Sequence, residues 1–162
     1  MDYRIGNGYD VHALAEGETL WLGGIQVEHH KGTIAHSDGD VLLHAICDAL
    51  LGALALGDIG KHFPDTDNTF KNIDSKILLG KCNQLVNTHG YKIVNIDSTI
   101  CAQRPKLKDH ITDMQVCIAK TLNIGKEQVS VKATTTEKLG FVGREEGISS
   151  YAVVLLKKYS FE

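Results

Sequence analysis

The feature that most limits how this chain can fold is a strongly periodic segment at residues 40–55, which predicts an amphipathic helix. Its apolar residues recur at helical spacing: Leu42, Ile46, Ala49, Leu50 and Ala53. Gly57 follows the last of them and is a typical helix stop. Segments before and after this helix have the pattern of extended strands. Strands that alternate with helices predict a β-sheet with helices packed against it.

The other segments follow the same alternation. Helices are predicted at 75–88 and 109–122, and strands at 3–12, 91–102, 129–133 and 150–157. A two-residue turn at Gly23 and Gly24 predicts a β-hairpin between the short segments Leu20–Leu22 and Ile25–Val27. The polar segments 28–39 and 58–72 predict loops. Because 162 residues is the length of one ordinary domain, we expect a single domain over residues 1–162.

Charge and hydropathy exclude several classes of partner. The formal net charge is −3, and no basic cluster is longer than the pair Lys157 and Lys158, which argues against nucleic-acid binding. The most apolar run, residues 49–57, is far too short to span a bilayer, and no signal sequence is evident. The wide spacing of the cysteines is typical of reduced thiols (Cys47, Cys82, Cys101 and Cys117). We therefore expect a cytoplasmic protein with no nucleic-acid or membrane partner.

Asp10 and His12 are the first pair with metal-binding chemistry. If residues 3–12 are extended, their two side chains point to the same side, and Val11 points into the core. An aspartate and a histidine at this spacing can hold one metal ion together. The polar edge of a strand has the same pattern, so the pair alone leaves both interpretations open.

The predicted helix carries a second polar group. Asp40, His44 and Asp48 are spaced four residues apart and should form one stripe along the helix. A buried imidazole between carboxylates needs polar partners, and a metal ion on one nitrogen with a carboxylate on the other would supply them. We expect Asp40 or Asp48 to accept the free N–H group of His44. The alternative is a solvated stripe with a simple acid–histidine pair.

Together, Asp10, His12 and His44 supply one carboxylate and two imidazoles. Three protein ligands with an open fourth position are typical of a catalytic zinc site. The same donor set also suits non-haem iron, so an iron-dependent oxygenase is an alternative hypothesis.

Two further segments have the residues that bind phosphates and sugars. The strand at 129–133 leads into Thr134, Thr135 and Thr136, whose hydroxyls suit phosphate oxygens, and Glu137 suits a hard cation such as Mg²⁺. A run of threonines is also common in strands. The acidic loop at 58–72 offers acceptors for sugar or polyol hydroxyls, although a solvated surface loop would have the same composition.

Long motifs throughout the chain resemble those of the 2-C-methyl-D-erythritol 2,4-cyclodiphosphate synthase family. They are Gly-Tyr-Asp-Val-His at 8–12, Ala-His-Ser-Asp-Gly-Asp at 35–40 with His44, Asp-Ala-Leu-Leu-Gly at 48–52, Gly-Asp-Ile-Gly-Lys at 57–61, Phe-Pro-Asp-Thr-Asp at 63–67, Ala-Gln-Arg-Pro-Lys at 102–106 and Lys-Ala-Thr-Thr-Thr-Glu-Lys-Leu-Gly-Phe at 132–141. The sequence departs from the family pattern at Asn7, where many members have a histidine, and at Glu145, where a small residue is common.

The resemblance implies an α+β fold, a mixed sheet with helices packed on one face, assembled as a homotrimer with active sites at the subunit interfaces. The implied enzyme is a phosphorus–oxygen lyase of the non-mevalonate isoprenoid pathway. It converts 4-diphosphocytidyl-2-C-methyl-D-erythritol 2-phosphate into 2-C-methyl-D-erythritol 2,4-cyclodiphosphate and releases CMP. A nucleotide-binding module that keeps the fold without the activity is a second alternative.

The resemblance also implies roles for individual residues. It assigns Asp10, His12 and His44 to zinc, Glu137 to a second divalent ion (Mg²⁺ or Mn²⁺), and catalysis to His36 and Thr135. The other matching substrate contacts are Val11, Ser37, Asp58, Ile59, Gly60, Phe63, Pro64, Asp65, Thr66, Asp67, Ala102, Gln103, Arg104, Pro105, Lys106, Leu107, Lys108, Thr134, Thr136, Phe141 and Arg144. In the family, an axial cavity bordered by residues matching Arg144 and Glu146 can hold an isoprenoid diphosphate.

Overall fold

The computed structural model describes residues 2–64, 66, 69 and 72–159. Its main feature is a five-stranded sheet in the order β4-β1-β7-β5-β6. These strands are β1 (Tyr3–Glu16), β4 (Lys31–Thr33), β5 (Tyr91–Cys101), β6 (Val129–Thr134) and β7 (Gly147–Lys158). β5 and β6 run parallel and the other pairs antiparallel, so the predicted mixed sheet is confirmed.

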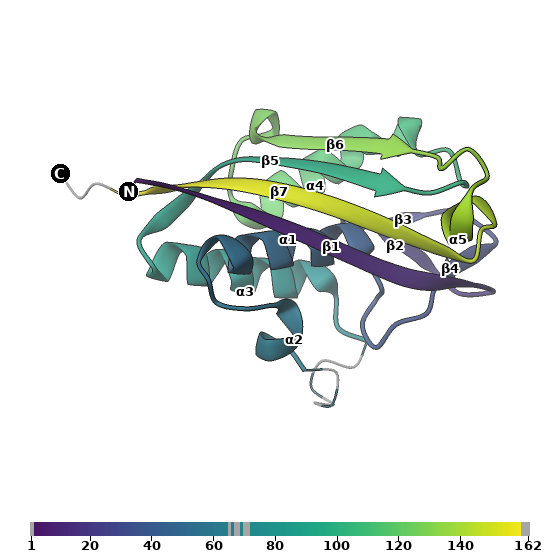
Figure 1. Cartoon of the computed structure of the whole chain (residues 1–162), viewed down its shortest axis with the longest axis horizontal. Coiled ribbons are helices and arrows are strands. Elements are labelled where there is room, and N and C mark those ends of the chain that lie inside the picture. Colours follow the sequence, from purple (N-terminus) through teal and green to yellow (C-terminus); the bar gives the residue numbers. More distant parts are fainter. Residues whose placement is uncertain (1, 65, 67–68, 70–71, 160–162) are drawn as a thin grey trace.

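Three helices cover one face of this sheet (Figure 1). They are α1 (Val41–Ala53), α3 (Ser75–Thr88) and α4 (Ile111–Leu122), and the apolar core lies between them and the strands. The shorter elements are the hairpin β2 (Leu20–Leu22) and β3 (Ile25–Val27), the one-turn helices α2 (Ile59–His62) and α5 (Gly140–Gly143), and 3₁₀ turns at Lys108–His110 and Lys126–Gln128. Within the described part of the chain, no helix is long and apolar enough to span a bilayer.

The hairpin and α3 have the predicted bounds, whereas the loop predictions were partly wrong. Residues 28–39 include β4, which pairs with the end of β1, and residues 58–72 include α2. β4 and α2 are too short to show a hydrophobic period, and unlike the hairpin strands they are not marked by a two-glycine turn, so the sequence pattern did not reveal them.

β1 carries the side chains that matter most for the site, and two glycines determine how close α1 lies to it. A Cβ atom on Gly8 would lie 1.9 Å from the backbone oxygen of Ala45, and one on Gly6 would lie 1.8 Å from that of Ala49. The backbone of α1 therefore packs directly on β1, which brings His44 next to Asp10.

The expectation that Val11 points into the core was wrong. Its side chain is 43% exposed and lies on the sheet face opposite the helices. Because side chains alternate along a strand, Asp10 and His12 occupy the helix-facing side, beside α1. The polar pair faces inward and the apolar residue outward, which reverses the usual arrangement.

Candidate metal centre

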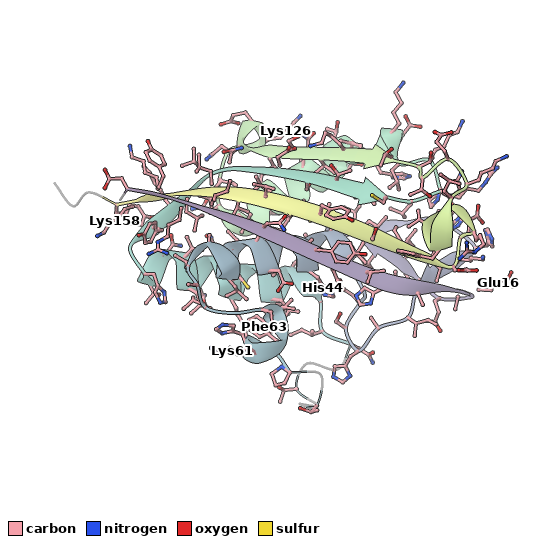
Figure 2. All side chains as sticks on the ribbon, in the orientation of Figure 1. Glu16, His44, Lys61, Phe63, Lys126 and Lys158 are labelled. Atoms are coloured by element: carbon pink, nitrogen blue, oxygen red, sulfur yellow. The ribbon has the colours of Figure 1, made fainter. Side chains whose placement is uncertain are left out.

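Asp10 and His12 on β1 meet His44 on α1 in one compact cluster. The Oδ2 atom of Asp10 lies 3.0 Å from Nε2 of His12 and 2.9 Å from Nδ1 of His44. The two imidazole nitrogens are 3.3 Å apart. Figure 2 shows His44 on α1, directly beneath β1. Residues separated by 32 and 34 positions in the sequence therefore converge as predicted.

The geometry of this cluster fits a divalent metal ion. Around a tetrahedral zinc ion with bonds of about 2.0–2.2 Å, neighbouring donor atoms lie roughly 3.3–3.5 Å apart, close to the separations of these three atoms. Among the described residues, this is the one group of three or more histidine, cysteine or acidic side chains that could hold an ion. One carboxylate and two imidazoles also suit iron, so the donors alone do not select zinc.

The surroundings of Asp10 keep its carboxyl group ionised. Burial opposes ionisation of Asp10, but hydrogen bonds to His12 and His44, together with their charges, outweigh it and lower the pKa of the carboxyl to about 2. Burial also favours neutral His44, yet Asp10 and the nearby charges of Asp40 and Asp38 raise the pKa of its imidazole. At neutral pH the carboxylate is therefore ready to bind a cation.

The imidazole of His44 is hydrogen-bonded to Asp10 and Ser75 and not to the carboxylate of Asp40 or Asp48, which corrects the prediction that one of these two acids accepts its free N–H group. Asp40 is fully buried as the N-cap of α1, and its carboxylate accepts the backbone N–H groups of Leu42, Leu43, Gly23 and Gly24 at 2.7–3.1 Å. Asp48 accepts the backbone N–H of Ile59 at 2.7 Å. Both acids hold backbone segments in place instead.

Replacing Asp40 with alanine should therefore lower stability and leave metal binding largely intact. The change removes a helix cap and leaves buried N–H groups without an acceptor, so we expect a loss of about 2–4 kcal/mol in the free energy of unfolding. Urea denaturation of the metal-free protein measures this. Asp113→Ala, an exposed acid in the first turn of α4, is the matched control and should change stability by less than about 0.5 kcal/mol. A tenfold or greater loss of zinc affinity in Asp40→Ala would restore its predicted role beside His44.

A cavity of about 340 Å³ opens beside the cluster. Its walls include the three metal-ligand candidates and several predicted substrate contacts: His36, Ser37, Ile59, Gly60 and Phe63. Sequence reasoning missed its other lining residues, Ala35, Ile73 and Leu78, because their side chains are apolar and carry no functional group that signals a site. The Nε2 atom of His36 is buried and has no hydrogen-bond partner among the described residues, so it is available to a ligand in the cavity.

A second cavity, of about 460 Å³, collects the other group of predicted contacts. It lies at the end of β5 and β6 and shares no lining residue with the first cavity. The predicted residues in its walls are Ala102, Gln103, Pro105, Lys106, Leu107, Lys108, Thr134 and Thr135. Within one chain, the two groups of predicted contacts are therefore not brought together.

Several predicted residues line neither cavity. Glu137 lies in the turn after β6 and accepts a hydrogen bond from the Thr135 hydroxyl at 3.3 Å. Arg144 forms a two-point ion pair with Glu146, at 2.9 and 3.1 Å. The others outside both cavities are Val11, Asp58, Pro64, Thr66, Arg104, Thr136 and Phe141. Asp65 and Asp67 fall outside the described residues.

The fold and the donor set define a class: an α+β protein with a candidate divalent-metal centre beside a cavity lined by histidine and serine. The chain belongs to the YgbB family, the family of 2-C-methyl-D-erythritol 2,4-cyclodiphosphate synthases, whose model matches residues 3–157.

Several known proteins are similar to this chain over nearly its full length. The 2-C-methyl-D-erythritol 2,4-cyclodiphosphate synthase of Bacteroides thetaiotaomicron is 63% identical over 158 residues, which is 98% of this chain and 99% of that protein. The solved structure of IspF from Plasmodium falciparum in complex with CDP is 37% identical, with 98% of each chain covered and a TM-score of 0.87. The bifunctional IspDF of Campylobacter jejuni is 48% identical, with a TM-score of 0.94, over 98% of this chain and 43% of that one.

Proposed function

We propose that this protein converts 4-diphosphocytidyl-2-C-methyl-D-erythritol 2-phosphate into 2-C-methyl-D-erythritol 2,4-cyclodiphosphate and CMP. It would act as a cytoplasmic phosphorus–oxygen lyase in the non-mevalonate isoprenoid pathway. One domain over residues 1–162 carries the activity. The observation that carries the proposal is the convergence of Asp10, His12 and His44 in the cavity that also contains His36 and Ser37. The synthase family to which the chain belongs agrees with it.

The reaction requires positioning and charge neutralisation rather than a protein nucleophile. An oxygen of the substrate's 2-phosphate attacks the β-phosphorus, a new P–O bond closes the ring, and the bond to CMP breaks. Two like unit charges 4 Å apart repel by about 4 kcal/mol at an effective dielectric of 20. A divalent ion held by Asp10, His12 and His44, when bound, supplies positive charge and polarises phosphate oxygens.

The chain's own residues complete the phosphate site. His36, with its free Nε2 atom, and the Ser37 hydroxyl face the same cavity as the ligand cluster and would bind the phosphates. Thr135 would stabilise the charge that develops during transfer, from the end of β6. Glu137 would hold a second ion, Mg²⁺ or Mn²⁺, against the diphosphate. With one carboxylate from the chain, phosphate oxygens and water would supply the other ligands, as is usual for Mg²⁺.

The second cavity is the proposed cytidine site. It is lined by 102–103 and 105–108, and two solved relatives have CDP bound. The segments at 58–60 and 63–67 would accept hydrogen bonds from the ribose and methylerythritol hydroxyls, with Phe141 and Arg144 as further contacts. Because cytidine and the attacking phosphate belong to one substrate, we propose that the first cavity of one copy and the second cavity of a neighbouring copy together form each active site.

We infer a homotrimer with active sites between subunits from that separation and from an uncovered apolar sheet face. On the side of β1 and β7 away from the helices, large apolar side chains are exposed: Ile5, Tyr9, Val11, Tyr151 and Val153. Tyr9 and Tyr151 are cross-strand partners with ring centroids 4.8 Å apart. An exposed apolar surface of this kind is typical of a protein–protein interface.

Replacing Tyr151 with lysine should dissociate the trimer. Tyr151 is 49% exposed in the single chain, so the change costs the subunit fold little, whereas in the trimer it buries an ammonium group at each interface. Analytical ultracentrifugation should give a mass of three times 17.7 kDa for the unmodified protein and a shift toward 17.7 kDa for the variant. Val116→Lys, an equally exposed apolar position on α4, should remain a trimer. A Tyr151→Lys protein that remains a trimer would remove this face from the interface.

The axial cavity of the proposed trimer would take an isoprenoid diphosphate near Arg144. Arg144 already donates two hydrogen bonds to Glu146, and Glu145 adds a carboxylate 3.5 Å from Arg104. A diphosphate would therefore bind Arg144 through its remaining N–H groups, against the repulsion of these two carboxylates. Calorimetry with an isoprenoid diphosphate tests this part of the proposal, and no heat of binding at millimolar ligand would remove it.

One assay separates the proposed reaction from its alternatives. Zinc-loaded protein incubated with the cytidylyl substrate and Mg²⁺ should release CMP and the cyclic diphosphate in equal amounts, which ³¹P NMR can follow. An iron oxygenase would take up oxygen instead, and a nucleotide-binding module would bind CDP without producing CMP. Absence of CMP from the zinc-loaded protein would overturn the proposed function.

A further inference from the structure

We propose that Ser75 and Asp38 are positioning residues, which fix the imidazole of His44 in the orientation and tautomer that bind a metal ion through Nδ1. The proposal rests on the metal site of the proposed function. Neither residue belongs to the predicted ligand or substrate set, and neither was suggested by sequence spacing. Both act through His44 rather than on the substrate.

Ser75 provides the partner for the second nitrogen of His44. It is the first residue of α3, and its side chain is completely buried. Its Oγ atom lies 2.8 Å from Nε2 of His44, on the opposite side of the ring from Asp10. A bond between one imidazole nitrogen and a fixed protein group is the usual way in which a metal-binding histidine is oriented.

Asp38 determines which way this hydrogen bond runs. The Ser75 hydroxyl donates a short hydrogen bond to Oδ1 of Asp38, and the Ser75 backbone N–H donates to Oδ2 at 2.8 Å. A hydroxyl has one proton, so an oxygen that donates to Asp38 can only accept from His44. Nε2 of His44 must then carry a hydrogen, which leaves the lone pair of Nδ1 for an ion beside Asp10 and His12.

Ser37 is a weaker candidate for this role. Its Oγ atom is farther from Nε2 of His44, at 3.2 Å, and accepts the backbone N–H of Gly39 at the same distance. Ser37 also lines the cavity, whereas Ser75 does not. The structure therefore leaves Ser37 for the substrate and assigns the fixed contact to Ser75.

The backbone around Ser75 has its own supports, which makes the hydroxyl testable in isolation. Asn72 donates its backbone N–H to the carbonyl of His36 at 2.7 Å, and Asp38 donates its own to the carbonyl of Ile73 at 3.2 Å. The Ser75 backbone N–H bond to Asp38 does not depend on the side chain. Alanine at position 75 should therefore keep α3 in place and remove only the contact with His44.

The test compares zinc affinity in Ser75→Ala and Asp38→Asn, measured by competition with a chromogenic chelator. Ser75→Ala should bind zinc about 10–100-fold more weakly. In Asp38→Asn the amide N–H₂ group can donate to the Ser75 oxygen, so the Ser75 hydroxyl is free to donate to Nε2 of His44. This favours the tautomer with the proton on Nδ1, and zinc affinity should therefore also fall at least tenfold. Ser98→Ala is the matched control, because Ser98 is equally buried but bonds to the carbonyl of Ser130.

A second measurement distinguishes positioning from loss of structure. In zinc-loaded, ¹⁵N-histidine-labelled protein, the Nε2-bound proton of His44 should exchange slowly with solvent, and Ser75→Ala should speed that exchange while Ser98→Ala does not. If Ser75→Ala fails to fold, Asp38→Asn can be compared with Ser98→Ala in its place.

Zinc affinities within twofold of the unmodified protein in both variants, or zinc bound to Nε2 of His44, would overturn the proposal. Failure of the unmodified protein to bind zinc would remove the metal site itself, whereas failure to form CMP with zinc bound would leave this inference intact.

Discussion

Replacing His12 with alanine should abolish formation of CMP and leave the fold intact. The variant loses one of the three donor groups that converge at 2.9–3.3 Å, so bound zinc would retain only Asp10 and His44. A catalytic metal contributes several kcal/mol of charge stabilisation, and each 1.36 kcal/mol corresponds to a factor of ten in rate. We therefore expect turnover to fall at least about 10³-fold.

His12 is a suitable residue to remove because it lines the cavity beside the other two ligand candidates. Its side chain is 20% exposed and lines the cavity rather than the apolar core, so alanine at this position mainly enlarges the cavity. Initial rates of CMP release and zinc content by mass spectrometry give the two readouts. His89→Ala is the matched control, since His89 is an exposed histidine at the end of α3, bonded to the Leu85 carbonyl. Full activity in His12→Ala would contradict the assigned ligand set.

Replacing Gly8 with alanine should destabilise the protein severely, by about 3 kcal/mol or more. The added Cβ atom would lie 1.9 Å from the backbone oxygen of Ala45 and 2.8 Å from the backbone nitrogen of Ala49. Neither is the end of a flexible side chain, so the relief of the clash requires α1 to move away from β1. That movement would carry His44 away from Asp10, and we expect zinc affinity to fall together with stability.

Replacing Gly52 of α1 with alanine should instead raise the stability of the protein. A Cβ atom there meets only the backbone oxygen of Asn7, at an ordinary 3.7 Å. Alanine in place of a helical glycine should stabilise the protein by about 0.5–1 kcal/mol. Urea denaturation of both metal-free variants measures the difference. A Gly8→Ala protein as stable as the unmodified one would contradict the close packing of α1 on β1.

The sequence predicted the parts of the structure that depend on local periodicity. The apolar spacing in residues 40–55 identified α1, and the two-residue spacing of Asp10 and His12 placed both side chains on one face of β1. Long elements repeat their pattern several times, so the period is unambiguous. The same local reasoning predicted a sheet with helices packed against it and the ligand candidates, whereas the mixed character of the sheet followed only from the family resemblance. Local reasoning could not assign inside and outside, and Val11 was placed on the wrong face.

The parts that could not be predicted depend on contacts between distant segments. Asp40 looked like one member of a polar stripe, but it is buried because the turn at Gly23 and Gly24 packs against the start of α1. Ser75 looked like an ordinary helix start, and only the arrangement of α1 and α3 places it 2.8 Å from His44. Such pairings have no signature in spacing along the chain.

Anomalous diffraction from zinc-loaded crystals would show whether Asp10, His12 and His44 bind one metal ion together. We expect a single zinc peak about 2.0–2.2 Å from Oδ2 of Asp10, Nε2 of His12 and Nδ1 of His44, with Nε2 of His44 still facing Ser75. A zinc ion bound elsewhere, or bound with one of these three side chains turned away, would contradict it.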